Sequence, residues 1–311
     1  MTESNKIAYV FPGQGSQKVG MGLDLYNSFD SVKAIFQEAD KTLGVPLSKL
    51  CFEGPEEELR QTINAQPALV VMSYACYQAA LSVNDRSKIV KPIFLAGHSL
   101  GEYTALAVAG VLDFRTTVYL ARERGRLMYE AGQLIPGAMA AILGLDEQAV
   151  TEICRETGTW LANINCPGQL VISGPKENIE QAIVLAKAKG ASRALPLQVS
   201  GAFHSPLMQP AADGLSAIIN KLSFREPEIP VIANTSAQPL RTADEIKNEL
   251  MQQLCHSVQW QRSVEYMIEK RVSTFIEIGA GNVLTGLIKR ISKNVKISNI
   301  GTAAELNNLI S

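Results

Sequence analysis

A chain of 311 residues can form one large domain, or a large and a small one, with an ample core. Its 46% hydrophobic and 19% charged residues are ordinary for a soluble globular protein, and a net charge of −1 gives no bulk electrostatic reason to bind nucleic acid or an anionic membrane. Five dispersed cysteines without C-x-x-C spacing predict reduced thiols. With no signal-peptide pattern at the start and no apolar run long enough to span a bilayer, we expect a cytoplasmic protein.

A glycine-rich turn follows the first predicted strand, Ile7–Phe11. The turn reads Pro12-Gly13-Gln14-Gly15-Ser16-Gln17 and lacks the Gly-Lys-Ser/Thr of a P-loop. It either brings Gln14 and main-chain amides to a reacting centre or is a plain strand-to-helix turn. The residues alone leave both interpretations open.

Residues 24–85 alternate helical stretches with polar breaks. One helix is predicted from Gly54-Pro55, with acids in its first turn, and another is predicted to open at Gln66-Pro67 and run through Ala79. Because a strand follows these helices, the order of elements indicates an α/β fold.

That strand, the apolar segment Ile89–Leu95, leads into Gly97-His98-Ser99-Leu100-Gly101 and then a helix predicted to end at Gly110. Gly-x-Ser-x-Gly between a strand and a helix places the serine hydroxyl on a sharp, crowded turn. The helix N-terminus also points free N–H groups at any oxyanion formed there. This context favours a nucleophilic Ser99 over a tight turn that merely contains serine.

The next predicted helix, Phe114 to about Tyr129, has Asp113 as its N-cap. Helical spacing places Arg124 inside the apolar arc, whereas Arg122 and Arg126 fall on the polar side. A buried guanidinium needs a carboxylate, a carbonyl or a ligand anion. A structural salt bridge or a snorkelling stem is the simpler alternative for Arg124.

Residues 137–199 differ in pattern from the rest. We predict strand, helix, strand, strand, helix and strand over 138–145, 146–157, 160–165, 169–173, 176–190 and 193–199, the ferredoxin-like order βαββαβ. This unit is predicted to be inserted into a discontinuous catalytic domain of residues 1–136 and 200–311. The cleft between the two is the natural ligand site.

After the insertion come Gly201-Ala202-Phe203-His204, strands over 229–234 and 274–279, and a helix after Val258-Gln259-Trp260. The glycines at 279, 281 and 286 do not have dinucleotide-binding spacing, so we assign them to packing and turns.

These stretches, in this order, resemble the malonyl-CoA:acyl-carrier-protein transacylase family, which includes acyltransferase domains of polyketide synthases. The resemblance spans nearly the whole chain and rests on five stretches: Phe11–Gln17, Gly97–Glu102, Arg124-Gly125, Gly201–His204 and Val258–Trp260. It implies a hydrolase-like core with a parallel sheet and a ferredoxin-like insertion.

The resemblance also implies the site residues. By similarity, Ser99 is the nucleophile and His204 its base, Gln14 and the amide of Leu100 form the oxyanion hole, and Arg124 binds the malonyl carboxylate. Phe203 is the wall against an α-methyl branch, and Gln259 lies in the segment whose backbone orients the histidine.

Elimination among the three histidines agrees with His204 as the base. His98 adjoins Ser99, but neighbouring side chains point apart, and His256 has no motif around it. An imidazole suits the role near neutral pH because serine is a weak nucleophile until its proton is taken.

The implied reaction moves malonyl from malonyl-CoA to the phosphopantetheine thiol of acyl carrier protein through a malonyl-serine, for fatty acid biosynthesis and without a metal or redox cofactor. We expect a monomer. A trans-acting polyketide acyltransferase remains an alternative. So does a serine esterase or thioesterase, although such enzymes run Ser, Asp or Glu, then His, often with a different oxyanion loop. A carrier-docking module without activity is disfavoured because every expected chemical group is present.

Overall fold

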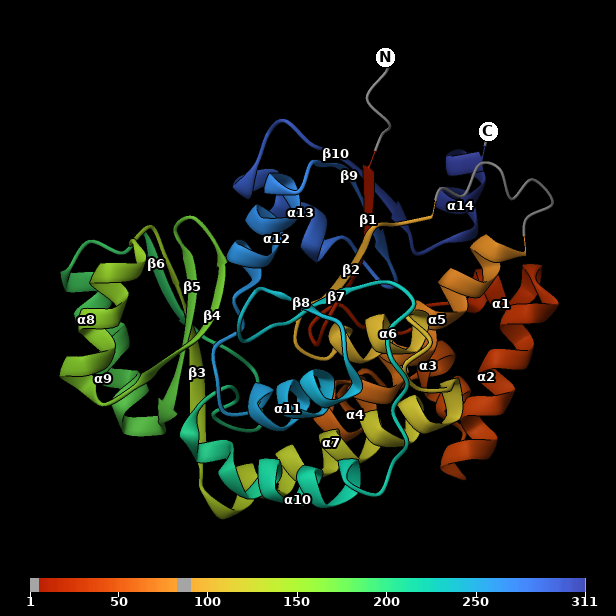
Figure 1. Cartoon of the computed structure of the whole chain (residues 1–311). Helices are drawn as coiled ribbons and strands as arrows, with labels where there is room; N and C mark the ends of the chain where they lie inside the picture. Colours follow the sequence, from red (N-terminus) through yellow and green to blue (C-terminus); the bar gives the residue numbers. More distant parts are fainter. Residues whose placement is uncertain (1–5, 83–90, 311) are drawn as a thin grey trace.

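The computed structural model describes residues 6–82 and 91–310, and in it two sheets carry the fold (Figure 1). The large sheet has six strands in the order β10-β9-β1-β2-β7-β8, and the small one has four in the order β4-β5-β3-β6. The predicted fold class, a hydrolase-like α/β core with a ferredoxin-like insertion, is confirmed.

Every neighbouring pair in the large sheet is parallel except β7 with β8. Predicted strand Ile89–Leu95 is shifted toward the serine, to Phe94–Gly97, and its first two positions, 89 and 90, lie outside the described residues. The strands are β1 Lys6–Phe11, β2 Phe94–Gly97, β7 Val231–Ile232, β8 Pro239–Leu240, β9 Val272–Ile278 and β10 Lys296–Ile300.

Both faces of the large sheet are buried, as expected for a parallel sheet covered by helices. In β1, Tyr9 and Phe11 join the main core, whereas Ala8 and Val10 join a second core. The second core lies under α12 (Trp260–Glu269) and α13 (Val283–Ile291), which supply apolar side chains to it. This alternation with a period of two fixes which way each strand faces.

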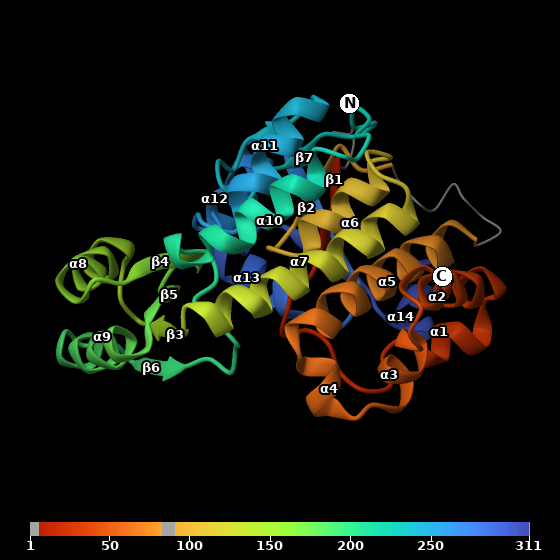
Figure 2. The same ribbon diagram turned by 90° about the horizontal axis from the view of Figure 1, so that it is seen from below.

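We call the large sheet and the helices that cover it the large part. Its remaining helices pack mainly on the first core, and α5, α7 and α10 lie side by side there (Figure 2). Among the described residues, none of the helices is both long and apolar enough to cross a membrane. The bounds are α1 Leu23–Ser28, α2 Asp30–Leu43, α3 Leu47–Glu53, α4 Glu56–Arg60, α5 Thr62–Leu81, α6 Gly101–Val108, α7 Phe114–Leu134, α10 Gln209–Ile219, α11 Ala243–Gln253 and α14 Ala303–Ile310, with a 3-10 turn at Pro206–Met208.

Helix α5 begins at Thr62, so the prediction that it opens at Gln66-Pro67 was wrong. Proline inside a helix removes the hydrogen bond to the carbonyl four residues earlier. Here that carbonyl belongs to Ile63, and it accepts from Arg122 Nη1 at 3.0 Å. An arginine from α7 therefore satisfies the group that Pro67 leaves unpaired.

The small sheet carries two helices on one face and has its own apolar core there. Its other face turns toward the large part, since Met139 and Val171 belong to the main core. Val258, from the large part, pairs alongside the edge strand β4. Its N–H donates to the carbonyl of Ala162, and its carbonyl accepts from the N–H of Ile164. The elements are β3 Gly137–Leu143, α8 Glu147–Thr157, β4 Trp160–Cys166, β5 Gln169–Pro175, α9 Lys176–Ala188 and β6 Arg193–Pro196.

Candidate active site

Ser99 lies on the turn between β2 and α6, with φ at +50°, in the left-handed region that side chains other than glycine rarely adopt. The turn is crowded. A Cβ at Gly97 would overlap the main chain of Gly101, and one at Gly101 would overlap the carbonyl of Phe11. The two glycines of the motif are therefore required by close main-chain approach, and the serine is presented on a sharp turn as the motif predicts.

The fold brings His204, 105 residues further along the chain, to Ser99. The distance from Ser99 Oγ to His204 Nε2 is 2.8 Å, and His204 Nδ1 lies 2.8 Å from the carbonyl oxygen of Gln253. A carbonyl can only accept, so Nδ1 carries the hydrogen and the lone pair of Nε2 faces the serine hydroxyl. This is the tautomer that a general base needs.

The imidazole is oriented by Gln253, at the end of α11, and the prediction that the Gln259 segment does this was wrong. Gln259 is the N-cap of α12, and its N–H donates to the carbonyl of Asn234 instead. The Gln253 side chain also contacts the serine turn: its Nε2 donates to the Ser99 carbonyl at 3.1 Å and to Glu102 Oε2 at 2.9 Å. The sequence Gln252-Gln253-Leu254 has no motif that distinguishes it.

Burial, together with the nearby positive charge of Arg124, lowers the pKa of His204 to about 3. The imidazole is therefore neutral, and able to accept a proton, at every pH well above that value. We expect the rate of Ser99 acylation in the wild type to stay flat from pH 8 to about pH 5. Rapid-quench mass spectrometry of the acyl-enzyme measures this rate, and a half-maximal rate near pH 6.5 would mean that His204 titrates like an exposed histidine.

Arg124 is 1% exposed and lies beside the same hydroxyl. Its Nη2 donates to Ser99 Oγ at 3.1 Å and to Gln253 Oε1 at 2.8 Å, and Nη1 donates to Gln66 Oε1 at 2.8 Å. Across residues 6–82 and 91–310 it has no carboxylate partner within ion-pair distance, and its Nε is unpaired. The salt-bridge alternative is thereby removed. A buried cation held only by neutral groups can bind a ligand anion.

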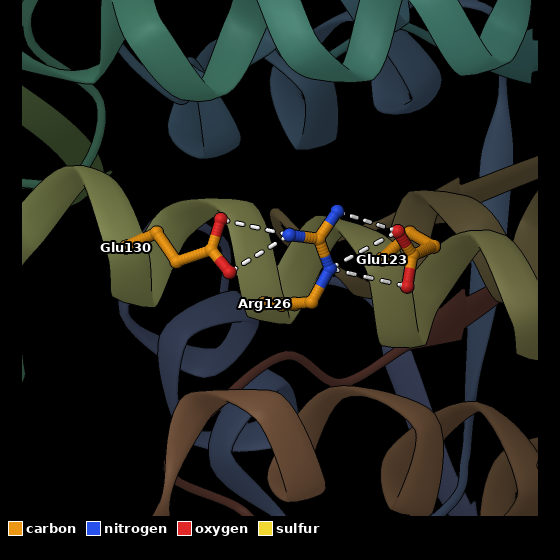
Figure 3. Close-up of polar contacts among 3 residues, drawn as sticks. All are labelled: Glu123, Arg126 and Glu130. Carbon is orange, nitrogen blue, oxygen red and sulfur yellow. Dashed lines mark hydrogen bonds and ion pairs between the residues drawn. The ribbon is translucent and has the colours of Figure 1, made fainter.

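Arg126, half a turn further along α7, shows what a structural arginine on this helix looks like (Figure 3). It is bonded on one side to Glu123 and on the other to Glu130, with its shortest contact to each at 2.7 Å. These carboxylates raise its pKa above the ordinary value. Arg126 therefore provides a matched control for substitutions of Arg124.

Two main-chain N–H groups beside Ser99 are the candidate oxyanion donors. From His98 to Tyr103, every N–H except that of Leu100 donates to an acceptor within the described chain. The Leu100 N–H, at the N-cap of α6, is therefore free to stabilise negative charge beside Ser99. The Gln14 side chain donates to Thr62 Oγ1 at 3.1 Å, which fixes its direction, and we take the main-chain N–H of Gln14 as the second candidate donor.

This assignment predicts that Gln14→Ala lowers kcat by less than about tenfold, because the main-chain N–H is retained. Gln14→Pro removes that N–H and is expected to lower kcat by roughly 10²–10³-fold, the usual effect of losing one oxyanion donor. Steady-state acyl transfer measures both variants, with thermal unfolding as a check on folding. Equal losses in the two would place the function in the side chain or in the shape of the loop.

The site opens into a cavity of about 470 Å³ between the large part and the small sheet, as the predicted cleft requires. Phe203, 5% exposed, forms part of its wall beside His204. A larger cavity of about 660 Å³ lies near α1 and α14 and contains none of the predicted site residues. The smaller cavity is lined by Gln14, Gly15, Gln17, Glu56, Arg60, His98, Ser99, Arg124, Met128, Met139, Asn163, Leu197, Gln198, Val199, Phe203 and His204.

His98 has more contacts than the sequence suggests. Its Nε2 lies 2.8 Å from Oδ1 of Asn165, on the small sheet, and its ring packs on Trp260 at 5.7 Å. Burial lowers its pKa. His98 thus ties the serine turn to the insertion, although it makes no contact with the serine hydroxyl that would compete with His204 as the base.

Comparison with known proteins identifies the family. Residues 8–308 match the acyl transferase domain. The chain is 48% identical over 297 residues to the malonyl CoA-acyl carrier protein transacylase of Bacillus subtilis (strain 168), covering 94% of this chain and 92% of that one. The chain belongs to the malonyl CoA-acyl carrier protein transacylase family of acyltransferases. The predicted resemblance and enzyme class are confirmed.

Other members of this family agree over the same length. The transacylase of Escherichia coli (strain K12) is 45% identical over 290 residues, covering 92% of this chain and 93% of that one. Among solved structures, a malonyl-transacylase in complex with its type II polyketide-synthase acyl-carrier protein aligns with a TM-score of 0.93 and 41% identity over 98% of both chains.

Proposed function

We propose that this acyltransferase moves a malonyl group from malonyl-CoA to the phosphopantetheine thiol of an acyl carrier protein, through a malonyl ester on Ser99. The names of its relatives support this donor and acceptor. One observation carries the choice of acyl group: Arg124 is a buried cation beside the nucleophile whose partners are all neutral. A malonyl thioester differs from an acetyl thioester by one carboxylate, which a guanidinium can bind through two parallel hydrogen bonds.

In the first half of the cycle, His204 Nε2 takes the proton of Ser99 as the serine oxygen attacks the thioester carbonyl. The N–H groups of Leu100 and Gln14 stabilise the oxyanion. The C–S bond then breaks, His204 returns the proton to the leaving thiolate, and CoA departs. In the second half, His204 takes the proton of the carrier's pantetheine thiol, and the sulfur attacks the serine ester. The ester C–O bond then breaks, and His204 passes the proton to the Ser99 oxygen. Every group used belongs to this chain or to its two substrates.

The serine esterase or thioesterase alternative is weakened by the partner of the base. Esterases of this motif place a carboxylate on the histidine, whereas His204 donates to the Gln253 carbonyl. Phe203, beside His204 in the cavity, is proposed to narrow the pocket against an α-methyl branch, which such a wall disfavours without excluding.

A role in fatty acid biosynthesis is proposed over a trans-acting role in polyketide synthesis, and a monomer over an oligomer. The separation into residues 1–136 with 200–311 and an inserted 137–199 is supported by the separate apolar core of the small sheet.

The test follows radiolabelled malonyl-CoA with and without a pantetheine-bearing carrier protein. We expect label on the carrier thiol at a rate far above the release of free malonate. Release of malonate at an undiminished rate in the presence of carrier would identify a thioesterase instead.

A further inference from the structure

The Ser99 turn is strained, and this strain must be held by its surroundings. A serine at φ +50° occupies a sparsely populated backbone region, and such residues persist only where neighbouring groups fix them. Helix α6 starts directly after the turn, so the same backbone sets the direction of the Leu100 N–H. Whatever fixes this turn therefore positions both the nucleophile and an oxyanion donor.

One side chain bonds the turn on both sides of His98. Asn234 Nδ2 donates to the carbonyl of Gly97 at 2.7 Å, and its Oδ1 accepts from the N–H of Ser99 at 2.6 Å. Asn234 follows β7, which pairs in parallel with β2, so its carboxamide continues the pairing of these strands where β2 bends away. The side chain is 2% exposed and is closed off from water.

The Asn234 main chain is fixed from two other elements. Its N–H donates to Oε2 of Glu102, on α6, at 3.2 Å, and its carbonyl accepts from the N–H of Gln259 at 2.7 Å. The stretch Val258-Gln259-Trp260 thus bears on the site through the serine turn and not through the histidine. A carboxamide is the group required here because the turn presents one acceptor and one donor at once.

We propose that Asn234 is a positioning residue for the acylation of Ser99, which rests on the function proposed above. Asn234 keeps the Ser99 hydroxyl next to the His204 imidazole and keeps the Leu100 N–H directed at the position of the oxyanion. It touches no reacting atom itself. A displacement of a reacting group by about 1 Å costs roughly 10²-fold in rate. Loss of Asn234 is expected to slow acylation by about that factor and to leave the KM for the acyl donor within a few-fold.

The test compares wild type with Asn234→Ala, Asn234→Asp and the control Asn299→Ala, measuring malonyl-enzyme formation by rapid-quench mass spectrometry from pH 8 to pH 5. Asn299, on β10, likewise uses its carboxamide inside the fold, donating to the buried carboxyl group of Glu277, but it lies at the far edge of the sheet. Its loss is expected to leave the acylation rate unchanged. A circular dichroism spectrum establishes that each variant folds.

The aspartate variant separates positioning from folding. An ionised Asp at 234 can accept from Ser99 but repels the Gly97 carbonyl, whereas the neutral acid donates to that carbonyl and restores both bonds. Buried carboxyl groups of Glu102 and Glu249 adjoin position 234, Arg124 is linked to Glu102 through the Gln253 side chain, and His98 lies within the turn. Burial and these acids favour the neutral form of the new aspartate.

The rate of Asn234→Asp relative to wild type is therefore expected to rise as pH falls, or to stay near wild type if the aspartate is neutral throughout. Asn234→Ala is expected to stay slow at every pH. Asn234→Asp as slow as Asn234→Ala from pH 8 to pH 5, or Asn234→Ala within threefold of wild type, would overturn the proposal. Failure of the wild type itself to form a malonyl-enzyme would refute the proposed function instead.

Discussion

Replacing Ser99 by alanine is expected to abolish the malonyl-enzyme, because the 2.8 Å contact with His204 is the structure's means of activating a hydroxyl at this site. His204→Ala is expected to slow acylation by roughly 10⁴–10⁶-fold, since a nucleophile and its base act as a unit. Intact-protein mass spectrometry after mixing with malonyl-CoA measures both.

His256, which is not assigned as the base, supplies the control. His256 is exposed and its Nδ1 lies 2.9 Å from the carbonyl oxygen of Gln252, so His256→Ala is expected to retain the adduct. An added malonyl mass on the Ser99→Ala protein would place the nucleophile elsewhere.

Arg124→Ala is expected to change the choice of acyl group. A malonyl carboxylate would then be buried without a partner, at a cost of about 3–5 kcal/mol, or roughly two to four orders of magnitude in kcat/KM. An acetyl thioester has no carboxylate and is expected to lose far less, so the preference shifts toward neutral acyl groups. Arg124→Lys is expected to recover only part of the malonyl rate, because a point charge cannot reproduce the guanidinium fork.

Arg126→Ala is the matched control, on the same helix and with the same change in charge. Its side chain pairs with Glu123 and Glu130 on the exposed face of α7. Exposed pairs of this kind contribute about 0–1 kcal/mol, so kcat/KM for both thioesters should stay close to wild type. If Arg124→Ala lowered the malonyl and acetyl rates equally, Arg124 would be a structural residue. The proposal that it selects malonyl over acetyl would then be wrong.

The parts of the site that follow from local chemistry could be predicted from the sequence. Gly97 and Gly101 flank a serine that lies on a crowded turn. Arg124 interrupts an apolar helix face, where a buried charge requires a partner or a ligand anion. The alternation of strands and helices over 137–199 likewise predicted the inserted sheet. Each of these signals lies within one turn, one helix or one continuous stretch of the chain.

What the sequence did not reveal depends on contacts between distant segments. Gln253 orients His204 through a main-chain carbonyl, and any residue type can supply a carbonyl, so no side-chain pattern marks the position. The same holds for Pro67 inside α5, where Arg122, from another helix, donates to the Ile63 carbonyl that the proline leaves unpaired. In the sequence, Asn234 is an asparagine after a predicted strand with no motif around it. Only the fold brings its side chain to the Ser99 turn, where it makes two hydrogen bonds.

Transfer from the isolated malonyl-enzyme tests the central claim most directly. The protein is loaded with radiolabelled malonyl-CoA, freed of excess donor, and mixed either with carrier protein bearing its pantetheine arm or with the same carrier lacking it. We predict that the label leaves Ser99 and appears on the pantetheine thiol of the first carrier only. Label that stays on the enzyme, or that appears as free malonate at the same rate with either carrier, would contradict a double-displacement transfer through Ser99.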